Sequence, residues 1–195
     1  KAAAEYAKEL LSEYMPAEID ILGNVVGKKD DGQLHILLDA HLDSIGLVVR
    51  GIDDKGFLLV ERVGGMDERV LTGAEVTVHG KEELFGVICS VPPHLQKGDN
   101  KKELLSLKEM AVDIGYSKEE AEKLVEIGDR ITLRTTQAEL QNNNITSCSL
   151  DDRSCVAVLL KALQLTKGRI PSLKLTVLFS AQEETGGSGA KTAAY

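Results

Sequence analysis

One stretch near the end of the sequence constrains the fold more than any other. Residues 173–179, Leu-Lys-Leu-Thr-Val-Leu-Phe, are a short apolar run rich in β-formers. Such a run predicts a strand buried on both faces, as in a mostly parallel sheet. Two carboxylates, Glu183 and Glu184, and a glycine-rich turn follow. Ligands of open α/β sheets bind beyond the carboxyl ends of strands, so this pair lies where such a fold carries its chemistry. The alternative is a pair of solvated acids that closes a strand.

The flanking sequence predicts the rest of an α/β domain, a mostly parallel sheet with flanking helices. Apolar residues recur at helical spacing after Ala3 until Pro16 stops the run, which predicts a helix that covers the sheet. Further elements follow from the same reasoning: strands at residues 18–22, 24–27 and 35–39, and helices at 152–166 (ending near Gly168) and from 189.

The pattern changes between residues 45 and 145. Short runs of β-forming residues alternate with turn signals, which predicts strands at 45–52, 57–62, 75–79, 84–90, 110–114 and 130–134. Ser117 and Glu120 form a capping box that opens one helix, which Gly128 closes. We therefore expect residues 45–145 to form a small β-barrel-like insert in a discontinuous catalytic domain made of residues 1–44 and 146–195.

Charge and composition limit the partners. The chain carries 31 acidic and 23 basic residues, a net charge of −8, which argues against nucleic acid or an anionic membrane as the partner. No apolar run is long enough to span a bilayer, and no basic-then-apolar leader is visible. Three cysteines without CxxC spacing predict reduced thiols in a cytoplasmic protein.

Two other places in the sequence carry candidate metal ligands. His41 and Asp43 are two residues apart at the end of a predicted strand, so they share a face in extended backbone. The pair can orient a metal-binding imidazole through the carboxylate or surround one ion, although a lone histidine there can also be structural. Asp151 and Asp152 begin a predicted helix, where a cap explains one carboxylate but not two.

The three places can converge on one edge of one sheet. An imidazole with several carboxylates is a ligand set suited to Zn²⁺, Co²⁺ or Mn²⁺. Adjacent residues on a strand point to opposite faces, so we expect Glu183 and Glu184 to take different roles, one binding metal and the other acting as general base.

Three motifs together resemble the M42 family of metallo-aminopeptidases. They are Ala40–Asp43, Leu150–Arg153 and Gln182–Gly186, in the order in which the family has them. Gly64–Asp67 and Pro92–Leu95 in the insert are similar to the family as well. Some members of this family carry the names glutamyl aminopeptidase, deblocking aminopeptidase or endoglucanase.

The resemblance implies a site with two divalent ions per subunit, Zn or Co, that acts on peptide substrates. Carried over by motif, His41 would ligate one metal and Asp43 would orient the histidine. Asp151 would bridge both metals, Glu184 would ligate the second, and Glu183 would be the general base. The resemblance also implies a homo-oligomer, a dimer formed through the insert with dodecamers as a further assembly.

The chain departs from the family in ways that bear on activity. Ser44 replaces the usual acid, and Gly187-Ser188 replace the usual residues after the Glu-Glu motif, which affects the expected substrate preference. The resemblance implies truncation at both ends, with the remaining ligands beyond Tyr195. We therefore expect this chain alone to bind metal weakly and to be inactive.

Two alternatives remain open from the sequence. One is a metal-independent glycoside hydrolase, which needs two acids facing one sugar ring about 5–9.5 Å apart. The neighbouring positions of Glu183 and Glu184 fit this poorly, and His41 would have no role. The other is a non-catalytic assembly subunit with the family fold and an incomplete site.

Overall fold

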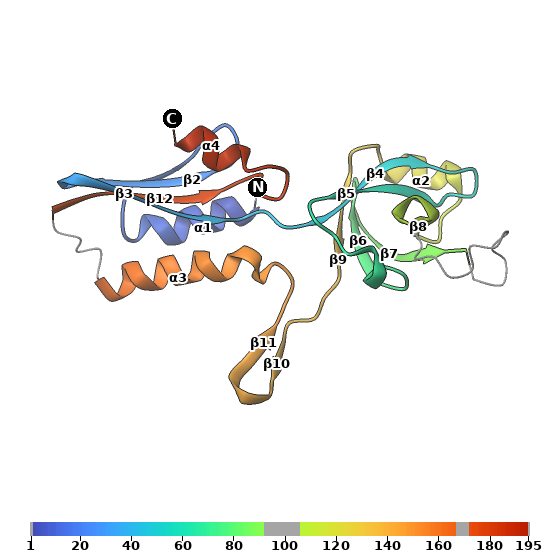
Figure 1. Ribbon diagram of the computed structural model, residues 1–195. Coiled ribbons are helices and arrows are strands. Elements are labelled where there is room, and N and C mark those ends of the chain that lie inside the picture. Colours follow the sequence, from blue (N-terminus) through green and yellow to red (C-terminus); the bar gives the residue numbers. More distant parts are fainter. Residues whose placement is uncertain (1, 92–105, 167–171, 195) are drawn as a thin grey trace. The chain divides into compact units, whose positions relative to one another are not determined.

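The computed structural model describes residues 2–91, 106–166 and 172–194 (Figure 1). The chain forms two compact units, one of Lys1–Ser44 with Ser149–Tyr195, and one of Ile45–Cys148. The expectations for Pro92–Leu95 and for the helix end near Gly168 lie outside the described residues. The first unit contains α1 (Ala2–Ser12), β1 (Ala17–Ile19), β2 (Val25–Asp30), β3 (Gly32–His41), α3 (Leu150–Thr166), β12 (Ser172–Ser180) and α4 (Ser188–Ala193).

The sheet of the first unit is mixed, so the expectation of a mostly parallel sheet is wrong for the described strands. Its order is β1-β2-β12-β3. β1 pairs with β2, and β2 with β12, in antiparallel register, while only β12 and β3 are parallel.

Chain connectivity explains this arrangement. β2 and β3 are separated by Asp31 alone and run in opposite directions, and β12 lies between them, so it can be parallel to only one. The apolar run of β12 correctly predicted a buried strand, since Val177, Leu178 and Phe179 are fully buried. Burial on both faces does not depend on the direction of the neighbouring strands, so the run could not give the direction.

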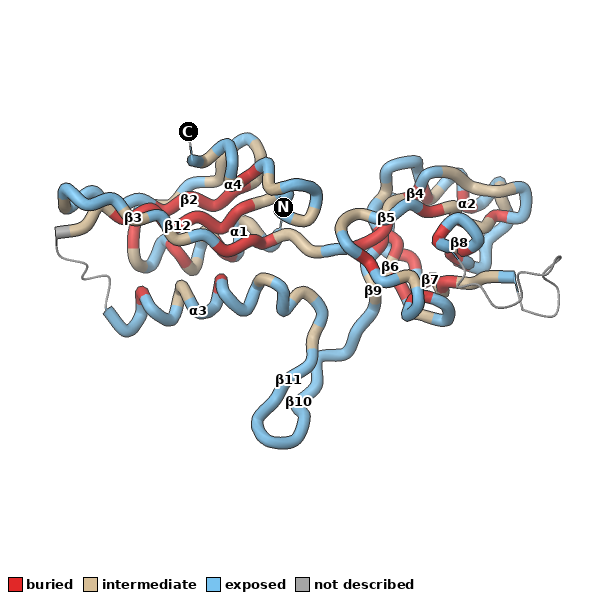
Figure 2. Tube along the Cα trace, in the orientation of Figure 1, coloured by how far each residue is buried: buried red, intermediate tan, exposed pale blue. Residues whose placement is uncertain are grey.

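The core of the first unit lies between the sheet and two helices. Figure 1 shows α1 and α3 on one side of the sheet and α4 on the other. Figure 2 shows the buried residues of this unit mainly in β2 and β12. The core cluster comes from α1 (Ala7, Leu11), Met15, the sheet (Val25, Ala40, Leu175, Val177, Phe179), Leu42, and α3 (Val156, Leu163).

The second unit is a closed barrel, which confirms the expected barrel-like insert. The strand order around it is β4-β5-β8-β7-β6-β9. The strands are β4 (Gly46–Ile52), β5 (Leu58–Val63), β6 (Glu75–His79), β7 (Glu83–Ser90), β8 (Met110–Asp113) and β9 (Arg130–Leu133). Short 3₁₀ helices lie at Glu68–Val70, Leu107–Glu109 and Gln141–Asn143.

The insert also carries the helix α2 (Lys118–Leu124) and a hairpin that the sequence did not predict. The Ser117–Glu120 capping box is present, but the helix ends at Leu124 rather than near Gly128, because Val125 is already extended. β10 (Ala138–Leu140) and β11 (Asn144–Thr146) pair only with each other, and all their residues are exposed. No helix in the described part of the chain is long and apolar enough to cross a membrane.

Gly56 supports a testable prediction about the barrel. It is buried with φ +93°, and a Cβ there would overlap the carbonyl oxygen of Tyr116. Gly73 has a similar φ of +85° but open space around it, so it isolates the conformational cost. We expect Gly56→Ala to lower the free energy of unfolding by about 3 kcal/mol or more, and Gly73→Ala by about 1–2 kcal/mol. Urea denaturation followed by circular dichroism measures both, and equal losses would contradict the overlap argument.

Candidate active site

The carboxyl ends of β3 and β12 meet because the two strands are parallel. Ser180, the last residue of β12, is paired with His41, the last residue of β3. The Leu42 N–H donates to the Ser180 carbonyl at 2.8 Å, so the pairing continues just past the strand ends. The segments that follow, with Asp43 on one side and Glu183 on the other, therefore start side by side.

His41 is buried, and the carboxylates of Asp151 and Glu183 lie near its Nε2. Its Nδ1 lies 3.1 Å from the backbone carbonyl oxygen of Asp43. Its Nε2 lies 3.1 Å from Asp151 Oδ1 and 3.7 Å from Glu183 Oε2. A carbonyl oxygen can only accept, so Nδ1 carries a proton and Nε2 is the nitrogen that faces the acids.

Electrostatics at His41 favour a positive charge. Burial lowers its pKa, but the hydrogen bonds to the Asp43 carbonyl and to Asp151, with the charges of Asp43 and Glu183, outweigh burial and leave the pKa above its ordinary value. A lone pair on Nε2 directed at ionised carboxylates would be repelled. Nε2 and the acids therefore share either a proton or a cation.

Asp43 makes contacts that differ from the expected ones. The ring of His41 is held by the carbonyl of Asp43, while the Asp43 carboxylate lies farther from Nδ1, at 3.7 Å. The carboxylate instead accepts the backbone N–H of Glu183 at 3.1 Å and of Glu184 at 3.2 Å. Asp43 therefore contacts both the histidine segment and the Glu-Glu segment.

Glu183 and Glu184 lie in a turn rather than on the strand. β12 ends at Ser180, and Gln182 has φ +60°. The alternation of strand side chains therefore does not separate the two residues, and that part of the sequence argument is wrong. The Glu183 carboxylate, half exposed, faces His41, whereas the Glu184 carboxylate has no hydrogen-bond or ion-pair partner among the described residues.

The two residues of the Asp-Asp motif lie at the start of α3, but their backbone is not helical. Asp151 and Asp152 have non-helical φ and ψ, and the peptide bond between them is cis. The Asp151 side chain is 89% exposed and contacts His41. Arg153 Nε donates to the Leu42 carbonyl at 3.4 Å, so the start of α3 is tied to the histidine segment.

Asn24 is a residue that the sequence analysis missed. Its buried side chain accepts the Ala181 N–H at 2.7 Å and donates to the Gly189 carbonyl at 3.1 Å and to Asp20 Oδ2 at 2.7 Å. These contacts hold both ends of the loop that carries the Glu pair. An asparagine beside Gly23 is typical of an ordinary turn, so no sequence signal marked it. Nearby, the buried Ser180 hydroxyl has no hydrogen-bond partner within the described structure.

The described residues fit part of a metal site. The Nδ1–H tautomer of His41, fixed by a backbone carbonyl, is the form that presents Nε2 to an ion, and the neighbouring donors are carboxylate oxygens. Such a set suits Zn²⁺, Co²⁺ or Mn²⁺. However, no three His, Cys, Asp or Glu side chains of residues 2–91, 106–166 and 172–194 form a group that could hold an ion.

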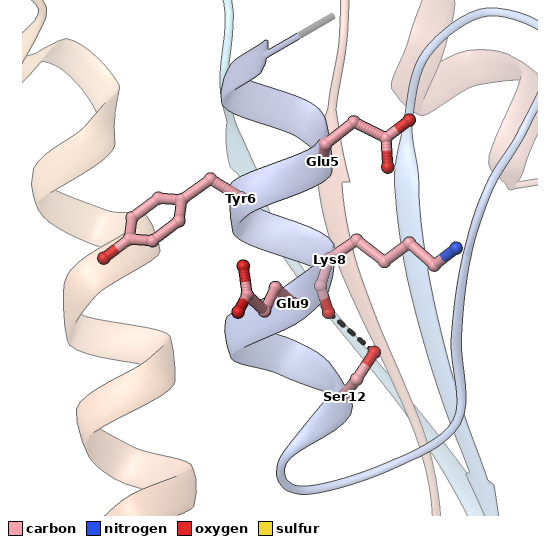
Figure 3. A pocket seen from close by; sticks show the side chains of 5 residues that line it. All are labelled: Glu5, Tyr6, Lys8, Glu9 and Ser12. Carbon is pink, nitrogen blue, oxygen red and sulfur yellow. Dashed lines mark hydrogen bonds between the residues drawn. The ribbon is translucent and has the colours of Figure 1, made fainter.

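A surface pocket on α1 lies apart from the candidate site at the ends of β3 and β12. It has a volume of 380 Å³ and is lined by Glu5, Tyr6, Lys8, Glu9 and Ser12. Figure 3 shows these side chains along one helix, with the Ser12 hydroxyl donating to the Lys8 carbonyl at 2.7 Å. None of the predicted site residues lines it, so the strand ends remain the candidate site.

Comparison with solved structures defines the class of this fold. An aminopeptidase from the archaeon Desulfurococcus kamchatkensis is 37% identical, with a TM-score of 0.89 over 98% of this chain and 54% of its own. The TET1 peptidase of Pyrococcus horikoshii, which can assemble into a tetrahedron or a large octahedral shell, is 35% identical, with a TM-score of 0.86 over 97% of this chain and 58% of its own. The α/β class is confirmed, and the fold is that of aminopeptidases.

The family follows from the sequence itself. Residues 23–195 match the model of the M42 glutamyl aminopeptidase family, and the chain belongs to this family. Among curated relatives, lysyl aminopeptidase of Pyrococcus furiosus is 30% identical over 91% of this chain and 52% of its own length. The motif resemblance is therefore confirmed. The chain spans about half the length of the curated relatives that it matches.

Proposed function

We propose that this chain supplies part of the active site of a metal-dependent aminopeptidase, which removes N-terminal residues from peptides. The observation that carries the proposal is the position of His41 Nε2, which faces Asp151 and Glu183 where the parallel strands β3 and β12 end. Membership of the M42 family and the aminopeptidase neighbours support the reaction type.

Each residue has a separate role in this proposal. His41, Asp151 and Glu184 would contribute ligands to two divalent ions, Zn or Co. The chemistry that such ions supply when bound is Lewis-acid polarisation of the scissile carbonyl and activation of the attacking water. The Glu183 carboxylate accepts the proton of that water and passes it to the leaving amine. Asp43 keeps the Nδ1 proton of His41 in place through its carbonyl.

The test joins residues 1–195 to the part of the Desulfurococcus kamchatkensis aminopeptidase that this chain does not cover; we refer to the product as the joined chain. We expect the folded joined chain to release N-terminal residues from aminoacyl arylamides, and the 195-residue chain alone to show no turnover. Exhaustive chelation should abolish the activity, and Zn²⁺ or Co²⁺ should restore it. A folded, metal-loaded joined chain without turnover would refute the proposal.

The same experiment separates the alternatives. Hydrolysis of aryl glycosides that survives metal removal, with no hydrolysis of aminoacyl arylamides, would favour a metal-independent glycoside hydrolase. A joined chain that binds metal poorly and hydrolyses neither substrate class would favour a non-catalytic subunit.

The assembly and location of the protein are further parts of the proposal. The barrel unit is the proposed dimerisation domain. The Pyrococcus horikoshii TET1 peptidase, which can assemble into a tetrahedron or a large octahedral shell, supports a homo-oligomer. A cytoplasmic location remains a prediction from the cysteine pattern.

A further inference from the structure

We propose that Asp43 is the positioning residue of this site: its carboxylate binds the backbone of Glu183 and Glu184 and thereby places the Glu183 carboxylate beside His41. The catalytic consequence rests on the proposed function. The positioning itself is a property of this chain and can be measured without any activity.

The contact is built from two successive backbone amides on one carboxylate. Asp43 Oδ1 accepts the Glu183 N–H at 3.1 Å, and Oδ2 accepts the Glu184 N–H at 3.2 Å. Consecutive N–H groups that converge in this way beside a left-handed residue, here Gln182 at φ +60°, form an anion-binding nest. Hydrogen bonds to an ionised acceptor are stronger than those between neutral groups, so this contact fixes the turn firmly.

The other hydrogen bonds of the Glu-Glu turn do not fix its middle relative to β3. The Gly186 N–H donates to the Glu183 carbonyl at 2.9 Å, and the Gly187 N–H to the Gln182 carbonyl at 2.8 Å, so both bonds are internal to the turn. Asn24 holds the ends of the loop but not the two glutamates. Within the described residues, Asp43 therefore provides the hydrogen bonds that tie the glutamate backbone to the histidine segment.

Asp43 also holds His41, the residue that the Glu183 carboxylate faces. Its carbonyl accepts the Nδ1–H of His41 at 3.1 Å, while its carboxylate holds the glutamate amides. One residue thus sets the separation of His41 Nε2 and Glu183 Oε2, which is 3.7 Å. The Asp43 side chain is 24% exposed and forms no ion pair with a described lysine or arginine, so pairing with a basic side chain does not explain its position.

The experiment follows backbone amides by nuclear magnetic resonance in the 195-residue chain and in Asp43→Ala and Asp43→Asn. In the parent chain, the Glu183 and Glu184 amides should be protected from hydrogen exchange. In Asp43→Ala, both resonances should move and exchange at least tenfold faster, whereas the amide of Val177 in β12 keeps its rate. Asp43→Asn should give an intermediate result, since the asparagine keeps one acceptor oxygen.

Asp53→Asn is the matched control. Asp53 Oδ1 accepts the N–H of Lys55 at 2.8 Å and of Phe57 at 3.0 Å in a turn of the barrel unit, so the same substitution replaces a carboxylate that binds backbone amides elsewhere. It should leave the Glu183 and Glu184 amides unchanged.

Three results would overturn the proposal. The first is rapid exchange of both glutamate amides in the parent chain, and the second is no response to Asp43→Ala. The third is an equal acceleration throughout the first unit, which would make Asp43 a contributor to global stability only. If Asp43→Ala does not fold, the parent chain and Asp43→Asn decide the question.

Kinetics of the joined chain separate this proposal from the proposed function. Asp43→Asn should lower kcat at least tenfold and leave KM nearly unchanged, because in this proposal Asp43 acts through the position of Glu183 and not by binding the substrate. If the amides respond but kcat does not, the positioning stands and the assigned role of Glu183 fails.

Discussion

Replacing Glu183 with glutamine in the joined chain is expected to lower kcat by about 10²–10⁴-fold, the usual contribution of a general base. Glutamine has almost the same shape but cannot accept a proton from water. The fold should persist, because the side chain is half exposed and its backbone N–H, which binds Asp43, is retained. Steady-state kinetics on aminoacyl arylamides at saturating metal measure the effect, and a kcat above one tenth of the parent value would exclude this role.

Two further variants make that result specific. Glu82→Gln replaces an exposed glutamate in the barrel unit and should leave kcat unchanged. Glu184→Gln should instead weaken metal binding, so that activity returns as the metal concentration is raised. If Glu183→Gln behaves like Glu184→Gln, the two residues have been assigned in the wrong order.

Local turn chemistry explains why the barrel strands were predictable. The Asp53–Gly56 signal between β4 and β5 works through contacts inside the turn: Asp53 accepts the amides of Lys55 and Phe57. Such contacts involve neighbours in sequence, so the sequence reports them directly. The hairpin β10–β11 has only exposed residues in strands of three residues each, and it was missed because hydrophobic periodicity over a longer run is the main signal for a strand.

The direction of the sheet and the geometry of the Glu pair depend on distant segments. β12 enters between β2 and β3 after more than a hundred intervening residues, and its apolar run is compatible with either direction. The motifs predicted that His41, Asp151 and Glu184 gather around shared ions. The structure places His41 beside Asp151 and Glu183, whereas Glu184 contacts Asp43 through its backbone N–H. The Asp43 contact could not be predicted, because its partners are backbone amides, which every residue except proline carries.

Asn24→Ala is expected to lower the free energy of unfolding of the first unit by about 3–5 kcal/mol. The substitution removes three hydrogen bonds and leaves the Ala181 N–H and the Gly189 carbonyl without their partner, and each buried unsatisfied group costs about 1–3 kcal/mol. Asn144→Ala is the matched control, because Asn144 is exposed and makes one side-chain bond, to the Gln141 carbonyl; its cost should stay near 0.5 kcal/mol.

Urea denaturation followed by circular dichroism measures both asparagine variants, and the amide resonances assign the loss to the first unit. The bonds of Asn24 join the β1–β2 turn to both ends of the Glu-Glu loop, so the damage should concentrate there. Hydrogen exchange of Glu183 and Glu184 should therefore accelerate in Asn24→Ala even though Asp43 is intact. A loss below about 1 kcal/mol, or unchanged exchange at the two glutamates, would show that the loop keeps its position without the asparagine.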